Sequence, residues 1–201
     1  MSYIQGIIHF GIPILPSALQ GTTFFDADWA SDASTRCFTS VYCTYIGDTL
    51  ISWMVKKLQT VTRSSIEAEY CALAATAIDV IWILRLLSDF HLPQSTLTDI
   101  HYENRSTIAF ANNMIFHVRT KHIEVDFHFI HDHIQTHEFC FITNSTMDQL
   151  ADILTKPLPT HRYHLLQSKL TVQPSPLACR EVKTLTSTTY YDAQDHRDNH
   201  H

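Results

Sequence analysis

Four acidic residues, each in a separate segment of the chain, are the side chains best suited to chemistry. They are Asp26 in TTFFDADWA, Glu67 in RSSIEAEYCAL, Glu103 in IHYENRSTIAFA and Asp152 in MDQLADILTKPLP. Carboxylates that a fold brings together from distant segments are typical ligands of a hard divalent cation such as Mg²⁺. Two such ions about 3.5–4 Å apart can promote hydrolysis of a phosphodiester. The sequence therefore predicts a carboxylate site for two Mg²⁺ ions, which Mn²⁺ could replace.

Composition limits the class of protein that this chain can be. With 201 residues and 45% apolar residues, one packed domain with extensions is expected. The formal net charge of −6 argues against tight autonomous binding of nucleic acid, which normally needs a basic surface. Five cysteines without a CxxC pair favour a reduced intracellular protein over a disulfide scaffold. No run of 18 apolar residues occurs, so neither a membrane-spanning helix nor a membrane partner is expected.

Hydrophobic periodicity predicts an alternation of strands and helices. Alternation over 22–29 indicates a strand with Phe24, Asp26 and Asp28 on one face, and a hairpin with a Gly47-Asp48 turn follows. The remaining strands are predicted at 37–46, 49–55, 99–103 and 138–143, and helices at 64–87, 105–113, 121–135, 147–156 and 162–170. Trp29, Trp53 and Trp82 are expected in the core. This order predicts an α/β fold in which helices cover a mixed sheet.

Five segments together resemble a known family. DADWA, LISWMVKK, VTRSSIEAEY, HVRTKHIEVDFHFI and DQLADILTKPL occur in the order and spacing of the ribonuclease H domain that ends the polyprotein of Copia-type retrotransposons. The resemblance runs from about Tyr3 to about Val172 and implies a ribonuclease H-like, five-stranded mixed sheet flanked by helices. It divides the chain into a remnant of the upstream polymerase and connection region (1–20), the ribonuclease H-like domain (21–158) and a C-terminal helix extension (159–172). The polar composition of 173–201 predicts a disordered tail.

The resemblance implies a hydrolase: an endonuclease that cuts the RNA strand of an RNA–DNA hybrid with two Mg²⁺ ions. The family's metal-binding carboxylates fall on Asp26, Glu67 and Asp152, and Glu103 stands where the family has Asp. The extra methylene of Glu103 moves its carboxylate outward by roughly 1.5 Å. A misplacement of about 1 Å can cost around a hundredfold in rate, so activity is expected to be weakened or lost. Ser31 and Val41 replace family glycines, and either could strain the backbone.

The resemblance also implies partners and a cellular setting. The expected partners are an RNA–DNA hybrid and the upstream reverse transcriptase region of a parent polyprotein, in a cytoplasmic virus-like particle or in the nucleus. Candidate nucleic-acid contacts are Arg63, Arg119, Lys121 and His122. A solvated surface accounts for Arg63, Arg119 and Lys121 equally well, whereas His122 lies in the family segment RTKHIE and is expected to have a structural or substrate-side role.

Three alternatives stay open at the level of sequence. Glu67 lies three residues after Ser64, so it could simply cap the helix. The chain could be a catalytically inactive retroelement remnant that binds nucleic acid weakly. It could also be a zinc-binding interaction module, because several potential ligands fall in one region: His117, His122, His128, His131, His133, His137 and Cys140.

Overall fold

The computed structural model describes residues 10–29, 38–58, 64–92, 94, 96–104, 106–108 and 124–174. The chain divides into two units, Ile12–Gln173 and a second unit of Met1–Gly11 with Pro174–His201. Strand β1 (Phe10–Gly11) pairs with β7 (Gln173–Pro174). The rest of the predicted tail lies outside the described residues.

A five-stranded mixed sheet forms the centre of this unit, in the order β4-β3-β2-β5-β6. Its strands are β2 (Gly21–Trp29), β3 (Phe38–Ile46), β4 (Thr49–Leu58), β5 (Thr98–Tyr102) and β6 (Phe139–Thr143). The pairs β2-β3 and β3-β4 are antiparallel, whereas β2-β5 and β5-β6 are parallel. Gly47 makes the β3–β4 turn at a φ of 56°, which glycine adopts without a Cβ clash. The predicted α/β, ribonuclease H-like fold is confirmed.

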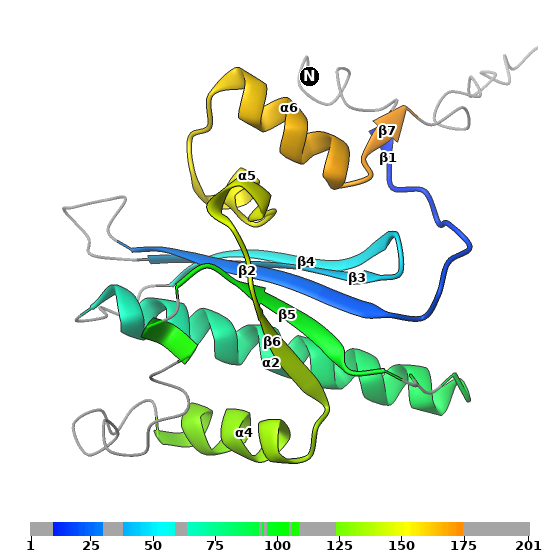
Figure 1. The fold of residues 1–201 in the computed structure, drawn as a ribbon, viewed down its shortest axis with the longest axis vertical. Helices are drawn as coiled ribbons and strands as arrows, with labels where there is room; N and C mark the ends of the chain where they lie inside the picture. The colour runs from blue at the N-terminus through cyan, green and yellow to red at the C-terminus, as the bar shows by residue number, and fades with distance from the viewer. Residues whose placement is uncertain are drawn as a thin grey trace, which may run out of the picture. The chain divides into compact units, whose positions relative to one another are not determined.

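Helices cover both faces of the sheet. Figure 1 shows α2 (Ser65–Asp89) and α4 (Glu124–Gln135) on one side, and α5 (Asp152–Thr155) and α6 (Thr160–Lys169) on the other. Each side has its own apolar core. The core under α2 is built around Tyr70, Leu73, Ile100 and Ile130, all with no exposed surface. The core under α5 and α6 is smaller and contains Cys43, Tyr45, Leu50, Leu150 and Leu166.

The predicted helix 147–156 is interrupted in the structure. A single 3₁₀ turn covers Thr146–Asp148, and α5 begins only at Asp152. Between them Gln149 is extended, with a ψ of 100°, and its side chain is completely buried. Its Nε2 donates to the carbonyl of Phe25 at 3.1 Å. A buried amide needs a hydrogen-bond partner, and Gln149 finds one on β2. The extended backbone at Gln149 therefore replaces a continuous helix, and the segment is held against β2.

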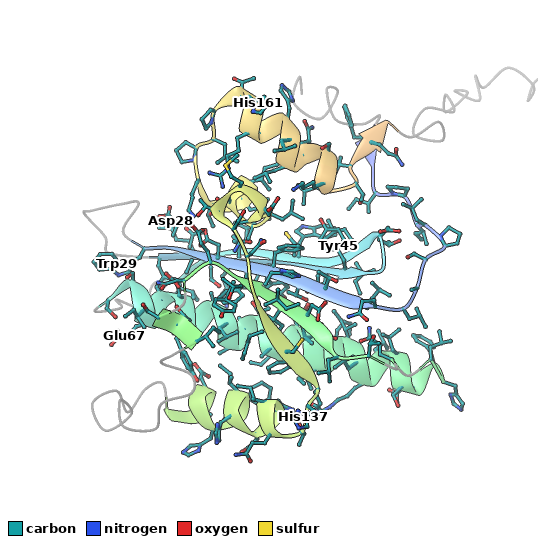
Figure 2. The ribbon with its side chains drawn as sticks, in the orientation of Figure 1. Asp28, Trp29, Tyr45, Glu67, His137 and His161 are labelled. Carbon is teal, nitrogen blue, oxygen red and sulfur yellow. The ribbon has the colours of Figure 1, made fainter. Side chains whose placement is uncertain are left out.

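The prediction that the three tryptophans lie in the core was wrong, because all three are exposed. Trp29, Trp53 and Trp82 have exposed fractions of 39%, 56% and 59%. Trp53 is an exposed residue of the edge strand β4, and Trp29 is the last residue of β2 (Figure 2). Trp82 belongs to the outer face of α2 with other exposed apolar residues, Ile78, Leu86 and Phe90. Aromatic content indicated these elements correctly, but not which face of each element packs inward.

Helix α2 is the one described helix whose length and composition would also suit a membrane span. A core helix of a globular protein passes the same test. In this structure α2 covers one face of the sheet (Figure 1), and Leu73 and Val80 are buried in the core that includes residues of the sheet.

Candidate active site

Asp26 and Glu103 are brought together by two neighbouring strands. Asp26 lies on β2, and Glu103 directly follows β5. These strands pair in parallel with Phe24 opposite His101, so continuing the register sets Asp26 beside Glu103. Thr155 Oγ1 on α5 donates to Asp26 Oδ2 at 2.7 Å, and Thr146 Oγ1 donates to Glu103 Oε1 at 2.5 Å.

A cavity of about 400 Å³ opens where β2 and β5 end, beside Asp26 and Glu103. It is lined by Phe25, Asp26, Ala27, Glu69, Tyr102, Glu103, Asn104 and Lys156. The carboxylate from α2 in this cavity is Glu69 and not the predicted Glu67. Glu69 accepts hydrogen bonds from Asn104 Nδ2 at 3.0 Å and from Thr107 Oγ1 at 2.5 Å. Burial raises the pKa of Glu69, the two hydrogen bonds oppose the shift, and the charges of Asp26 and Glu103 add to it.

Glu67, which the sequence predicted as the helix ligand, is not among the residues that line the cavity. Residues two apart in an α-helix point about 200° away from each other, so Glu67 and Glu69 cannot face the same side. Glu67 lies in the first turn of α2 (Figure 2), where its backbone N–H donates to the capping Ser64 Oγ at 3.2 Å. Burial, and then the charges of Asp126 on α4 and of Glu67, raise the pKa of Cys71 to about 11. Glu67 thus belongs to the side of α2 that carries Cys71 and meets α4.

A signal for Glu69 was present in the sequence. Glu69 stands at helical spacing from Leu73, Thr76 and Val80, which form the fully buried stripe of α2. Glu67 is at helical spacing from a second buried stripe that includes Tyr70, so both carboxylates continue apolar stripes. Periodicity alone did not tell which stripe meets the sheet.

Asp152 begins α5 and its side chain is completely buried. Two cations contact it. Lys156 Nζ lies 2.6 Å from Asp152 Oδ1, and Arg162 Nη2 contacts Asp152 Oδ2. The same Lys156 Nζ is 3.3 Å from Asp26 Oδ2 and 3.9 Å from Glu103 Oε2. Asp152 is therefore joined to the other carboxylates through a shared ammonium group.

The electrostatics of Lys156 follow from this position. Burial alone would lower its pKa, but the hydrogen bond to Asp152 and the negative charges of Asp26 and Asp152 outweigh burial and raise it. Lys156 is therefore positively charged among three carboxylates. In this structure the cation at the centre of the three carboxylates is the ammonium group of Lys156.

The donor set fits a hard divalent ion in its chemistry. Asp26, Glu69, Glu103 and Asp152 supply carboxylate oxygens, the ligands that Mg²⁺ and Mn²⁺ prefer. Within the described residues, however, no three Asp, Glu, His or Cys side chains converge closely enough to hold a metal ion. Lys156 Nζ stands among three of the carboxylates as a substitute cation.

Some of the other predicted residues lie in the described part of the chain, and the rest lie outside it. In the described part of the histidine-rich region, His131 bonds to Gln135, and His133 contacts Glu138; no zinc-like cluster forms there. Val41 has no positive φ, so the expected strain at that position is absent. Several predicted residues lie outside the described part of the chain: Ser31, Arg63, Arg119, His117, Lys121 and His122.

Comparison with known proteins identifies the relatives of this chain. No family model matches it. It is 36% identical over 183 residues to the retrovirus-related Pol polyprotein from transposon RE2 of Arabidopsis thaliana. The aligned region covers 90% of this chain and 13% of that relative. The corresponding protein from transposon RE1 of the same plant is 36% identical over 86% of the chain and 12% of the relative. The one from transposon TNT 1-94 of Nicotiana tabacum is 33% identical over 73% of the chain and 11% of the relative.

The fold and the carboxylate cluster thus occur in a chain that is homologous to part of the Pol polyproteins of Copia-type retrotransposons. It spans about an eighth of the length of the two Arabidopsis thaliana relatives.

Proposed function

We propose that this domain hydrolyses the RNA strand of RNA–DNA hybrids, with two divalent metal ions held by Asp26, Glu69, Glu103 and Asp152. One observation carries the proposal: carboxylates from β2, α2 and the end of β5 line a single cavity, and Asp152 of α5 joins them through Lys156. The relationship to retrotransposon Pol polyproteins supports it, because such an element makes RNA–DNA hybrids when it is reverse transcribed. The proposal replaces Glu67 by Glu69 as the ligand from α2.

The residues around the carboxylates hold them in place for this chemistry. Asn104 and Thr107 fix both oxygens of Glu69. Thr155 fixes Asp26, and Thr146 fixes Glu103. Such supporting bonds set the orientation of metal ligands, and losing one typically costs about 10–100-fold in metal affinity or activity. When bound, the metal ions would activate a water and stabilise the leaving oxygen.

The longer side chain of Glu103 is accommodated by its surroundings. Thr146 Oγ1 holds one of its oxygens, and the other lies 3.9 Å from Lys156 Nζ. Shortening the side chain with Glu103→Asp would test whether the extra methylene limits the rate. A gain of roughly tenfold in cleavage, about 1.4 kcal/mol of barrier, is expected if it does.

The test of function is cleavage of a labelled RNA–DNA hybrid by the purified full chain, with Mg²⁺ and then with Mn²⁺. Single-stranded RNA and a DNA duplex serve as substrate controls. Asp26→Asn should abolish cleavage, whereas Asp28→Asn should not. Asp28 is a matched control because it lies two residues along the same strand but does not line the cavity. A folded protein that leaves the hybrid intact with both metals would show an inactive remnant.

A further inference from the structure

The ammonium group of Lys156 occupies the centre of the carboxylate cluster. It contacts Asp152 at 2.6 Å, Asp26 at 3.3 Å and Glu103 at 3.9 Å, and these three residues come from three separate segments. Three carboxylates that face one point repel one another, and a positive charge between them offsets the repulsion. In the protein alone, Lys156 supplies that charge.

The position of Lys156 also allows its ammonium group to move out of the carboxylate cluster. It is the C-cap of the short helix α5, with extended backbone angles of −120° and 142°, and Pro157 follows it. Its side chain is 38% exposed, unlike that of Asp152, which has no exposed surface. A lysine ammonium sits on a flexible four-carbon stem, so it can move outward without a change in the backbone. Arg162 would remain on Asp152 and keep that carboxylate paired.

We propose that Lys156 is a built-in cation that competes with divalent metals for Asp26, Glu103 and Asp152. In the metal-free protein its ammonium holds the three carboxylates together. A divalent ion bound among the same oxygens repels the ammonium, so Lys156 must leave the centre when the metal binds. Lys156 therefore lowers metal affinity and stabilises the metal-free state. This inference rests on the proposed function, because it requires that the cluster binds metal at all.

The test compares Lys156→Met with Lys169→Met. Both substitutions remove one positive charge, but Lys169 pairs with Asp148 on the surface, away from the cavity. Mn²⁺ is titrated into each variant of the 201-residue chain by calorimetry, and its binding is also followed by electron paramagnetic resonance. Thermal melting is recorded in a chelator. Lys156→Met should bind Mn²⁺ roughly tenfold more tightly or better, and should melt at a lower temperature in the chelator. Lys169→Met should match the unmodified protein in both measurements.

The outcomes separate the two proposals. If the unmodified protein binds Mn²⁺ at the cavity and Lys156→Met binds it equally or more weakly, the competition is overturned and the metal site stands. If neither folded protein binds Mn²⁺, the proposed function fails and the competition fails with it. Binding by Lys156→Met alone would support the competition and show that Lys156 closes the site. If Lys156→Met does not fold, Lys156→Gln, which keeps a hydrogen-bond donor for Asp152, gives the same comparison.

Discussion

The two carboxylates of the EAEY segment, Glu67 and Glu69, are expected to differ in their effect on metal binding. A pair of substitutions tests this difference. Glu69→Gln and Glu67→Gln each remove one negative charge from the first two turns of α2 and change the side-chain volume little. Glu69 faces the cavity, whereas Glu67 belongs to the side of the helix that meets α4. We therefore expect only Glu69→Gln to weaken metal binding. The net charge of the two variants is the same, so each is the control of the other.

The size of the effect follows from the charge that is lost. Two unit charges 4 Å apart interact by about 4 kcal/mol at an effective dielectric constant of 20, and a divalent ion doubles that figure. Burial raises the pKa of Glu69, so part of this attraction is offset by the cost of a buried charge. We expect a net loss of about 2–3 kcal/mol, or roughly 30–150-fold in the dissociation constant for Mn²⁺. Glu67→Gln should change that constant by less than about threefold.

Stability in a chelator adds a second readout with a definite sign. Because the folded-state pKa of Glu69 is raised, its ionised form disfavours the folded state at neutral pH, and that penalty disappears as pH falls below the unfolded pKa. Glu69→Gln should therefore melt at a higher temperature than the unmodified protein at pH 7 without metal, and the gain should shrink at acidic pH. Loss of Mn²⁺ binding in Glu67→Gln, with binding kept in Glu69→Gln, would refute the assignment.

Three further predictions concern the scaffold. Asp152→Ala leaves Lys156 and Arg162 without their shared carboxylate, and should lower the free energy of unfolding by about 2–3 kcal/mol in urea titrations, since both cations are partly exposed. Leu73→Ala removes a completely buried side chain from the larger core and should cost about 2–5 kcal/mol by the same measurement. Burial raises the pKa of Cys43 to about 12, so iodoacetamide at pH 8 followed by peptide mapping should leave Cys43 unmodified until the protein is unfolded.

The sequence predicted most of the fold because its patterns are local. Alternation along β2 placed Asp26 correctly, and the position of Glu103 at the end of β5 followed from a short strand pattern. The choice between Glu67 and Glu69 needed the packing of α2 against both the sheet and α4, which no local pattern contains. Lys156 carried a signal, because it follows Asp152 by four residues, a helical ion-pair spacing. Its contacts with Asp26 and Glu103 depend on tertiary structure.

Side-chain exposure was the property least accessible from the sequence. Trp53 and Trp82 occur in strongly apolar segments, yet both side chains are more exposed than buried, Trp53 because it lies on an edge strand and Trp82 because it lies on the outer face of α2. The break at Gln149 was equally hidden, because it is caused by one hydrogen bond to the carbonyl of Phe25 on a distant strand.

The central claim is that four carboxylates, with Glu69 as the one from α2, hold divalent metal at the edge of the sheet. Anomalous diffraction from crystals grown with Mn²⁺ measures this directly. We predict anomalous peaks at coordination distance, about 2.0–2.4 Å, from oxygens of Asp26, Glu69, Glu103 and Asp152, with Lys156 Nζ moved out of the cluster. Peaks at Glu67 or at the histidines of α4, or Lys156 unmoved with no peak in the cavity, would contradict the claim.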